Sequence, residues 1–320
     1  MQPHMEKVCA GLKFLESFAH PNVKYHVVLS YTKISFGLLR FVTGNTDIQS
    51  MELWTTELPE QVKQFNTQIM YPYLNNRIEE EEKKDVVEKC IETVQDISRE
   101  LGPHGIIDQL EMLTVWCEKL LDKVTKCQNP TPLEGEEEKE PEFDSDGTEI
   151  RDEDDEHDPV ILGGVTGLII SLCKCLNEQF LPMLHRLIPK LAQYTVEEQH
   201  KNNKMMVIGC LSEVFNLCPA ASVIYFDDFI QVLLANTSTD VSTLNRNVAY
   251  GLGVLADKAA GDKFSPHLKG SITAIKTMYD ASEDDGAKDN CTASMAKIFE
   301  KYQKGLTESE FEEIFSHIMS

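Results

Sequence analysis

The glycines near residue 250 come closest to a motif that could do chemistry. Gly251-Leu-Gly253-Val-Leu-Ala256 matches the Gly-x-Gly-x-x-Gly/Ala fingerprint, in which a tight turn lets the backbone approach a dinucleotide pyrophosphate. The fingerprint requires a buried strand before it and a helix that opens at the glycines. Here a polar stretch precedes it, and apolar residues at helical spacing run through it. We therefore predict that these glycines let neighbouring helices pack closely and that no nucleotide binds there.

No other residue pattern predicts a catalytic or metal site. Cys173 and Cys175 lie two apart on a predicted helix, about 200° around its axis, so they cannot chelate one ion. The segment Asp152–Asp158 lacks the glycine that a calcium EF-hand loop needs at its sixth position. No nucleophile, base and orienting group can be assigned from spacing. We expect a protein without catalysis, cofactor or metal.

The charge of the chain is concentrated in one segment. Residues 134–158 contain 15 acidic and two basic residues and carry −13 of the total charge of −23. So many charges and so few apolar residues predict a disordered acidic insertion exposed to solvent. Its densest run, which could attract a basic partner, is Asp152, Glu153, Asp154, Asp155 and Glu156.

The overall composition limits the class of partner and the compartment. The chain has 53 acidic and 30 basic residues, and its net negative charge repels phosphate backbones. We therefore expect basic protein partners and no direct binding to nucleic acid. Nine scattered cysteines, an odd number, favour a reducing compartment over a disulfide framework. The start of the chain is not patterned as a signal peptide, and the longest apolar run, Val160–Cys173, contains three glycines. We expect no membrane insertion.

Helical periodicity dominates and repeats along the chain. Apolar residues recur at i, i+4 and i+7, a spacing that draws one narrow stripe along a helix. The five triplets with this spacing are Val87-Ile91-Val94, Val165-Ile169-Leu172, Val207-Leu211-Val214, Val248-Leu252-Leu255 and Cys291-Met295-Ile298. An earlier triplet, Val27-Tyr31-Ile34, is similar. Capping boxes at Thr46, Thr195 and Thr307, each with Gln or Glu three residues later, predict three helix starts.

The intervals between the triplets predict the architecture. The last four triplets start at Val165, Val207, Val248 and Cys291, so their starts are 42, 41 and 43 residues apart. A second helix is predicted in each interval. This is the length of a HEAT or armadillo repeat, a pair of helices. We predict an all-α chain, an α-solenoid of about six HEAT pairs with the last one incomplete. Its parts are N-terminal repeats in 1–133, the acidic insertion at 134–158 and C-terminal repeats in 159–320.

The helix face opposite each buried triplet is the predicted binding surface. Positions nine after, or two before, the start of a triplet lie about half a turn from the stripe. The acidic residues at these positions are Asp85, Asp96, Asp257, Asp289 and Glu300. They are our candidates for contact with a basic partner, although their positions alone slightly favour an ordinary polar helix face.

The sequence resembles a known family in its C-terminal half. Asn245–Asp257, NRNVAYGLGVLAD, followed by Lys288–Phe299, KDNCTASMAKIF, is similar to adjoining HEAT repeats of the importin-β-type karyopherins. The likeness is greatest to the branch that contains importins four and five, and it spans about Asp152 to Tyr302. Asn245 stands where that family usually has an arginine, with Arg246 beside it.

The resemblance implies a nuclear import receptor that shuttles between cytoplasm and nucleus through the nuclear pore. It implies basic cargo such as ribosomal proteins or histones, with Ran-GTP and Phe-Gly nucleoporins as further partners. Members of the family are several times longer, so the resemblance also implies a middle-to-C-terminal segment. Two alternatives stay open: a HEAT scaffold subunit, and an acidic histone chaperone, neither with transport activity.

Overall fold

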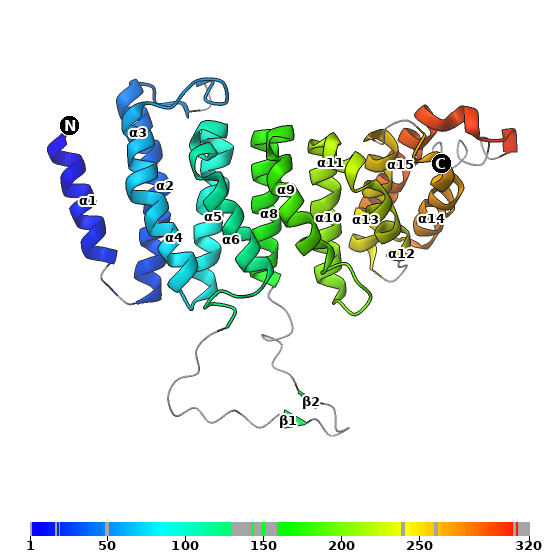
Figure 1. Cartoon of the computed structure of the whole chain (residues 1–320), viewed down its shortest axis with the longest axis horizontal. Coiled ribbons are helices and arrows are strands. Elements are labelled where there is room, and N and C mark those ends of the chain that lie inside the picture. The colour runs from blue at the N-terminus through cyan, green and yellow to red at the C-terminus, as the bar shows by residue number, and fades with distance from the viewer. Residues whose placement is uncertain are drawn as a thin grey trace. The chain divides into compact units, whose positions relative to one another are not determined.

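The structure of the chain is a computed structural model, shown in Figure 1. It describes residues 2–16, 18, 20–48, 51–129, 142–143, 149–150, 159–237, 241–258, 262–309 and 312. The chain divides into two compact units, Met1–Cys175 and Leu176–Ser320. Within the described residues all regular structure is helical, apart from two strands of two residues each.

In the first unit, helices pack side by side around α5. Its elements are α1 (Gln2–Glu16), α2 (Pro21–Thr43), α3 (Glu60–Phe65), the π-helical turn η2 (Asn66–Met70), α4 (Tyr71–Glu80), α5 (Lys84–Leu101), the 3-10 turns η3 (Gly102–Gly105) and η4 (Ile107–Gln109), α6 (Leu110–Leu121), β1 (Glu142–Phe143), β2 (Glu149–Ile150) and α8 (Pro159–Leu176). Helices α2 and α4 contact α5, and Gln95 of α5 donates a hydrogen bond of 3.0 Å to the carbonyl of Gly164 in α8. Figure 1 shows α8 beside α5 and α6.

The second unit has two layers of helices. Its elements are η5 (Asn177–Phe180), α9 (Leu181–Ala192), α10 (Lys201–Leu217), α11 (Pro219–Ile224), α12 (Phe226–Ala235), α13 (Ser242–Lys258), η6 (Ser265–His267), α14 (Leu268–Ala281), α15 (Asp285–Tyr302) and η7 (Gln303–Gly305). Helix α13 contacts both α10 and α15, while α9 contacts α10, α12 contacts α13, and α14 contacts α13 and α15. In the sequence, α9, α12 and α14 each lie between two successive triplets, which confirms the predicted second helices.

The buried stripe predicted from the sequence is confirmed. Every side chain of the five triplets is at most 2% exposed. In the earlier triplet Val27 and Tyr31 are buried and Ile34 is half-buried. The stripe is apolar because removing each such side chain from water contributes about 1.5–3 kcal/mol to folding.

One of the three predicted helix starts is wrong, and the other two are only partly described. Gln49, the partner of Thr46 in its predicted capping box, lies outside the described residues, and the next α-helix that the structure describes, α3, starts at Glu60. No helix begins at Thr195, since α10 starts at Lys201. The Thr195 hydroxyl instead donates to the carbonyl of Ala192 at 2.8 Å. After Thr307 the chain is helical at 308–309, and Glu310 lies outside the described residues.

Histidines cap two of the helices. Nδ1 of His200 accepts a hydrogen bond from the backbone N–H of Asn202, and Nδ1 of His20 accepts one from Asn22, each at 3.2 Å. An imidazole nitrogen does here what a serine or threonine oxygen usually does at an N-cap. The capping-box pattern contains no histidine, so it could not find these starts.

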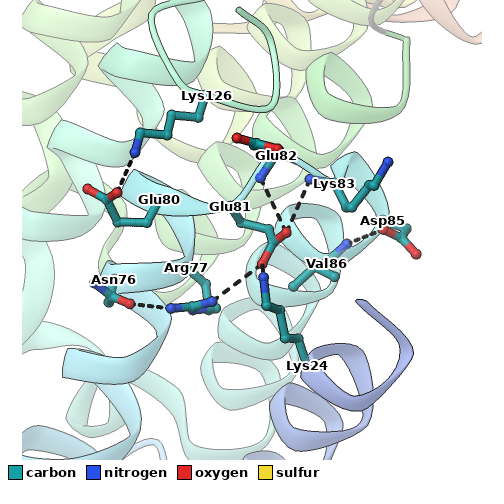
Figure 2. A network of polar contacts seen from close by, with 10 residues as sticks. All are labelled: Lys24, Asn76, Arg77, Glu80, Glu81, Glu82, Lys83, Asp85, Val86 and Lys126. Atoms are coloured by element: carbon teal, nitrogen blue, oxygen red, sulfur yellow. Dashed lines mark hydrogen bonds and ion pairs between the residues drawn. The ribbon is translucent and has the colours of Figure 1, made fainter. Parts of the chain in front are cut away.

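A buried glutamate joins three helical segments of the first unit (Figure 2). The side chain of Glu81 is 3% exposed, and it pairs with Lys24 of α2 at 2.7 Å and with Arg77 of α4 at 3.4 Å. It also accepts hydrogen bonds from the backbone N–H groups of Glu82 and Lys83, just before α5 begins. Glu81 therefore fixes the start of α5 relative to α2 and α4.

One stretch of the chain, Pro159–Ala192, is long and apolar enough to cross a membrane by length and composition alone. Asn177 interrupts its helix with a left-handed φ of 47°. The apolar side chains of Ile161, Val165 and Ile169 are fully buried in the helical packing. A core helix of a helical protein meets the same description, so this stretch is weak evidence for a membrane span.

Candidate binding surface

The exposed side of α5 carries four acidic residues in a row. Asp85, Glu88, Glu92 and Asp96 follow one another at intervals of three, four and four residues, so they lie along one side of the helix. We call these four residues the α5 stripe. Asp85 is exposed, and the other three side chains are partly exposed. The stripe contains two of the predicted residues, Asp85 and Asp96, and adds Glu88 and Glu92 between them.

The carboxylates of the α5 stripe repel one another. Burial raises the pKa of Glu88 above its ordinary value, and the charges of Glu92 and Asp85 raise it further, while Lys89 partly offsets them. A raised pKa means that the surroundings of Glu88 disfavour its negative charge. A positively charged partner would relieve this repulsion, so the arrangement is suited to binding cations.

Two basic residues partly neutralise the stripe from within α5. Lys89, with a side chain only 13% exposed, donates to Glu92 at 2.7 Å and lies 5.7 Å from the centre of the Tyr25 ring. Burial alone would lower the pKa of Lys89, but the hydrogen bond and charge of Glu92 raise it overall. Arg99 pairs with Asp96. With Lys84 at its start and Glu100 near its end included, α5 contains five acidic and three basic residues, so the helix keeps a net negative charge.

The stripe should lower the stability of the protein. We expect Glu88→Gln to raise the free energy of unfolding at neutral pH by about 0.2–0.5 kcal/mol, because it removes like-charge repulsion at helical spacing. The pKa of Glu88 is raised on folding, so the penalty for its charge is absent at low pH and appears as the pH rises through the acid range. Thermal unfolding of both proteins from pH 3 to pH 7 measures the difference.

An exposed carboxylate outside the stripe provides the control for this comparison. Glu52→Gln, in the loop before α3, should leave the unfolding temperature nearly unchanged at every pH. A loss of stability in Glu88→Gln at neutral pH would contradict the repulsion.

Two other predicted acidic residues, Asp257 and Glu300, lie near several lysines. The carboxylate of Asp257 on α13 pairs with Lys258 at 2.9 Å, and its backbone carbonyl accepts a hydrogen bond of 2.7 Å from Lys301. The hydrogen bond with Lys258 lowers the pKa of Asp257, and the charges of Lys258, Lys297 and Lys301 contribute. With Glu300 included, three lysines face two carboxylates. This end of α13 and α15 is thus less acidic than the exposed positions alone indicate.

The remaining predicted residues are not gathered into one place. Asp289 is exposed near the start of α15. The five acidic residues of the insertion, Asp152, Glu153, Asp154, Asp155 and Glu156, lie outside the described residues. Within the insertion the structure describes only β1 and β2, which pair antiparallel with Phe143 opposite Glu149.

Polar contacts that the sequence did not reveal link α10, α13 and α15. The hydroxyl of Tyr250 on α13 donates to Glu213 of α10 at 2.7 Å, and Lys297 of α15 lies 5.6 Å from the centre of the Tyr250 ring. Burial and the neighbouring Glu213 raise the pKa of Tyr250. Finding this chain requires the register of three helices, which single-helix periodicity does not give.

The glycines that match the nucleotide fingerprint lie inside a helix. Gly251 and Gly253 are buried in α13, which starts nine residues before Gly251. A β-carbon at Gly251 would lie 2.6 Å from the Ser212 hydroxyl, and one at Gly253 would lie 2.6 Å from the Ser294 hydroxyl. Close packing of α13 against its neighbours, as predicted, therefore accounts for both glycines.

The predicted helix cysteines are also part of the packing. Cys173 and Cys175 are both buried, and the thiol of Cys175 donates to the carbonyl of Ser98. Among the residues that the structure describes, no three His, Cys, Asp or Glu side chains gather as a metal site would require.

No protein-family model matches this chain. The likeness of Asn245–Asp257 and Lys288–Phe299 to importin-β-type karyopherins therefore stays an inference from those residues. The all-helical, side-by-side packing of the described residues is compatible with an α-solenoid.

Proposed function

We propose that this chain is a binding module that holds basic proteins on its exposed acidic surfaces and carries out no catalysis. The observation that carries the proposal is the α5 stripe, where four carboxylates lie on one side of a helix whose opposite side is buried. Burial, and then the charges of Glu92 and Asp85, raise the pKa of Glu88, so a cation beside it would stabilise its charged form. The acidic insertion adds a second source of negative charge.

We further propose that the helices form HEAT repeats and that the chain is a segment of an importin-β-type karyopherin. The repeat length of 41 to 43 residues and the order α10, α13, α15 in one layer support the repeat. The motifs around Asn245 and Lys288 support the family. In this proposal the cargo is a ribosomal protein or histone, Ran-GTP controls its release, and Phe-Gly nucleoporins are contacted during shuttling through the nuclear pore.

The test of this proposal is capture of partners from a cell lysate on the immobilised chain, with and without Ran-GTP. The karyopherin proposal expects basic proteins to be captured and Ran-GTP to reduce their amount. Capture of basic proteins that is indifferent to Ran-GTP would instead favour an acidic histone chaperone. Capture of neutral or acidic subunits alone would favour a HEAT scaffold.

A further inference from the structure

The exposed large apolar side chains of the described residues gather most densely on α1 and just after it. Val8 is 40% exposed, Phe14 65%, Leu15 42% and Phe18 43%. Val8 and Leu15 lie two turns apart on one side of α1, and Phe14 adjoins them. The rings of Phe14 and Phe18 meet edge to face, with their centroids 5.2 Å apart. We call these four residues the α1 patch.

Another side of α1 attaches the helix to α2. Leu12 is only 5% exposed, and the hydroxyl of Tyr31 on α2 donates a hydrogen bond to Glu16. A β-carbon at Gly11, between Val8 and Leu15, would meet nothing within 4 Å. A partner helix can therefore approach the backbone of α1 closely at this point.

The position of α1 makes this exposure significant. Figure 1 shows α1 at the N-terminal end of the first unit, beside α2. In stacked helical proteins the outer face of a terminal element is usually polar, because an apolar one lowers solubility. Helix α1 instead exposes the α1 patch, and contiguous exposed apolar groups commonly mark an interaction surface.

The C-terminal segment of the chain has a pattern that fits the α1 patch. The capping box at Thr307 predicts a helix there, and most of this segment lies outside the described residues. Apolar residues at i, i+3, i+4 and i+7 predict one apolar side of that helix, namely Phe311, Ile314, Phe315 and Ile318.

The charges of the two segments are complementary. Residues 307–319 contain four glutamates and neither lysine nor arginine. On α1, the exposed charged side chains that the structure describes are those of Lys7 and Lys13. An acidic amphipathic helix is therefore attracted to α1 by charge as well as by apolar contact.

We propose that the α1 patch binds the segment Thr307–Met319 of a second copy of this chain. The apolar side of the segment covers the α1 patch, and its glutamates lie near the lysines of α1. Because the two surfaces differ, the contact is head to tail, and each copy can bind two others. This self-association uses neither the α5 stripe nor the acidic insertion, so it does not depend on the proposed function.

The test begins with the mass of the full chain in solution, measured by light scattering at increasing concentration and physiological salt. We expect the mass to rise from that of a monomer to that of a dimer and larger assemblies. Phe14→Ser should weaken the association about tenfold, as the loss of an aromatic contact at an interface commonly does. Phe41→Ser on α2 is the matched control, because the Phe14 and Phe41 side chains are both 65% exposed, and it should change little.

A synthetic peptide of residues 306–320 tests the occupant directly. The peptide should bind the unmodified chain and lower the mass of its assemblies. Reversing the four glutamates of the peptide to lysine should weaken its binding to the unmodified chain. The same reversal should strengthen its binding to the Lys7→Glu, Lys13→Glu variant, because the charges are then complementary again.

A chain that stays monomeric at every concentration would overturn the proposal, whether or not its own C-terminal segment covers the α1 patch. Equal association of the Phe14→Ser and Phe41→Ser variants, or a peptide that does not compete, would overturn it too. Binding of a monomer to phosphatidylcholine vesicles that Phe14→Ser abolishes would assign the α1 patch to a membrane instead. Circular dichroism shows whether each variant retains its fold.

Discussion

Replacing Glu81 by alanine should lower the free energy of unfolding of the first unit by about 3–5 kcal/mol, the loss usually seen when one partner of a buried ion pair is removed. The Glu81 carboxylate pairs with Lys24 and Arg77 and accepts two backbone hydrogen bonds (Figure 2). Its removal leaves the side chain of Lys24, only 18% exposed, without that carboxylate. Urea unfolding followed by circular dichroism measures the effect.

The preceding residue supplies a matched control. Glu80 pairs with Lys126, and both of these side chains are about half exposed. Exposed pairs contribute little because water and salt screen them, so Glu80→Ala should scarcely move the unfolding midpoint. Equal shifts in the two variants would show that Glu81 is not the anchor of α2, α4 and α5.

Gly253→Ala should destabilise the second unit by about 1–3 kcal/mol through overpacking. A β-carbon at this position would lie 2.9 Å from Cβ of Ser294 and 3.1 Å from its Cα, so α15 must move away from α13. The movement would also strain the hydrogen bond of 2.7 Å from the Ser294 hydroxyl to the carbonyl of Ala249. Thermal unfolding of the variant provides the measurement.

The same substitution elsewhere should act in the opposite direction. Gly270 lies in α14, and a β-carbon there would meet nothing within 4 Å. Gly270→Ala should therefore stabilise the protein by up to about 1 kcal/mol through helix propensity alone. If Gly253→Ala is as stable as Gly270→Ala, close packing does not explain the glycine.

The sequence predicted what depends on a single helix. The triplets starting at Val87, Val165, Val207, Val248 and Cys291 are buried because helical periodicity puts each triplet on one side of its own helix. The role of Gly253 followed from the same stripe. Neither inference needed to know which helix lies next to which.

What the sequence could not predict depends on neighbouring helices. Glu79, Glu80, Glu81 and Glu82 are four identical residues in a row, and only Glu81 is buried, because Lys24 of α2 and Arg77 of α4 meet it. The exposed position of Asp257 was predicted, but its lysine neighbours on α15 were not, because they come from the next helix in the stack.

The central claim is that a basic partner is held by the α5 stripe rather than attracted by negative charge in general. Its most direct test is the off-rate of a histone or ribosomal protein from two variants with the same change of charge. One reverses Glu88 and Glu92 to lysine on α5, and the other reverses Asp289 and Glu300 to lysine on α15.

We expect the α5 variant to raise the off-rate about tenfold, because local charge pairs mainly set residence time. The α15 variant should mainly lower the on-rate, by an amount that shrinks as added salt shortens the Debye length. Off-rates that are the same for both variants would contradict the claim and assign the binding to the acidity of the whole chain.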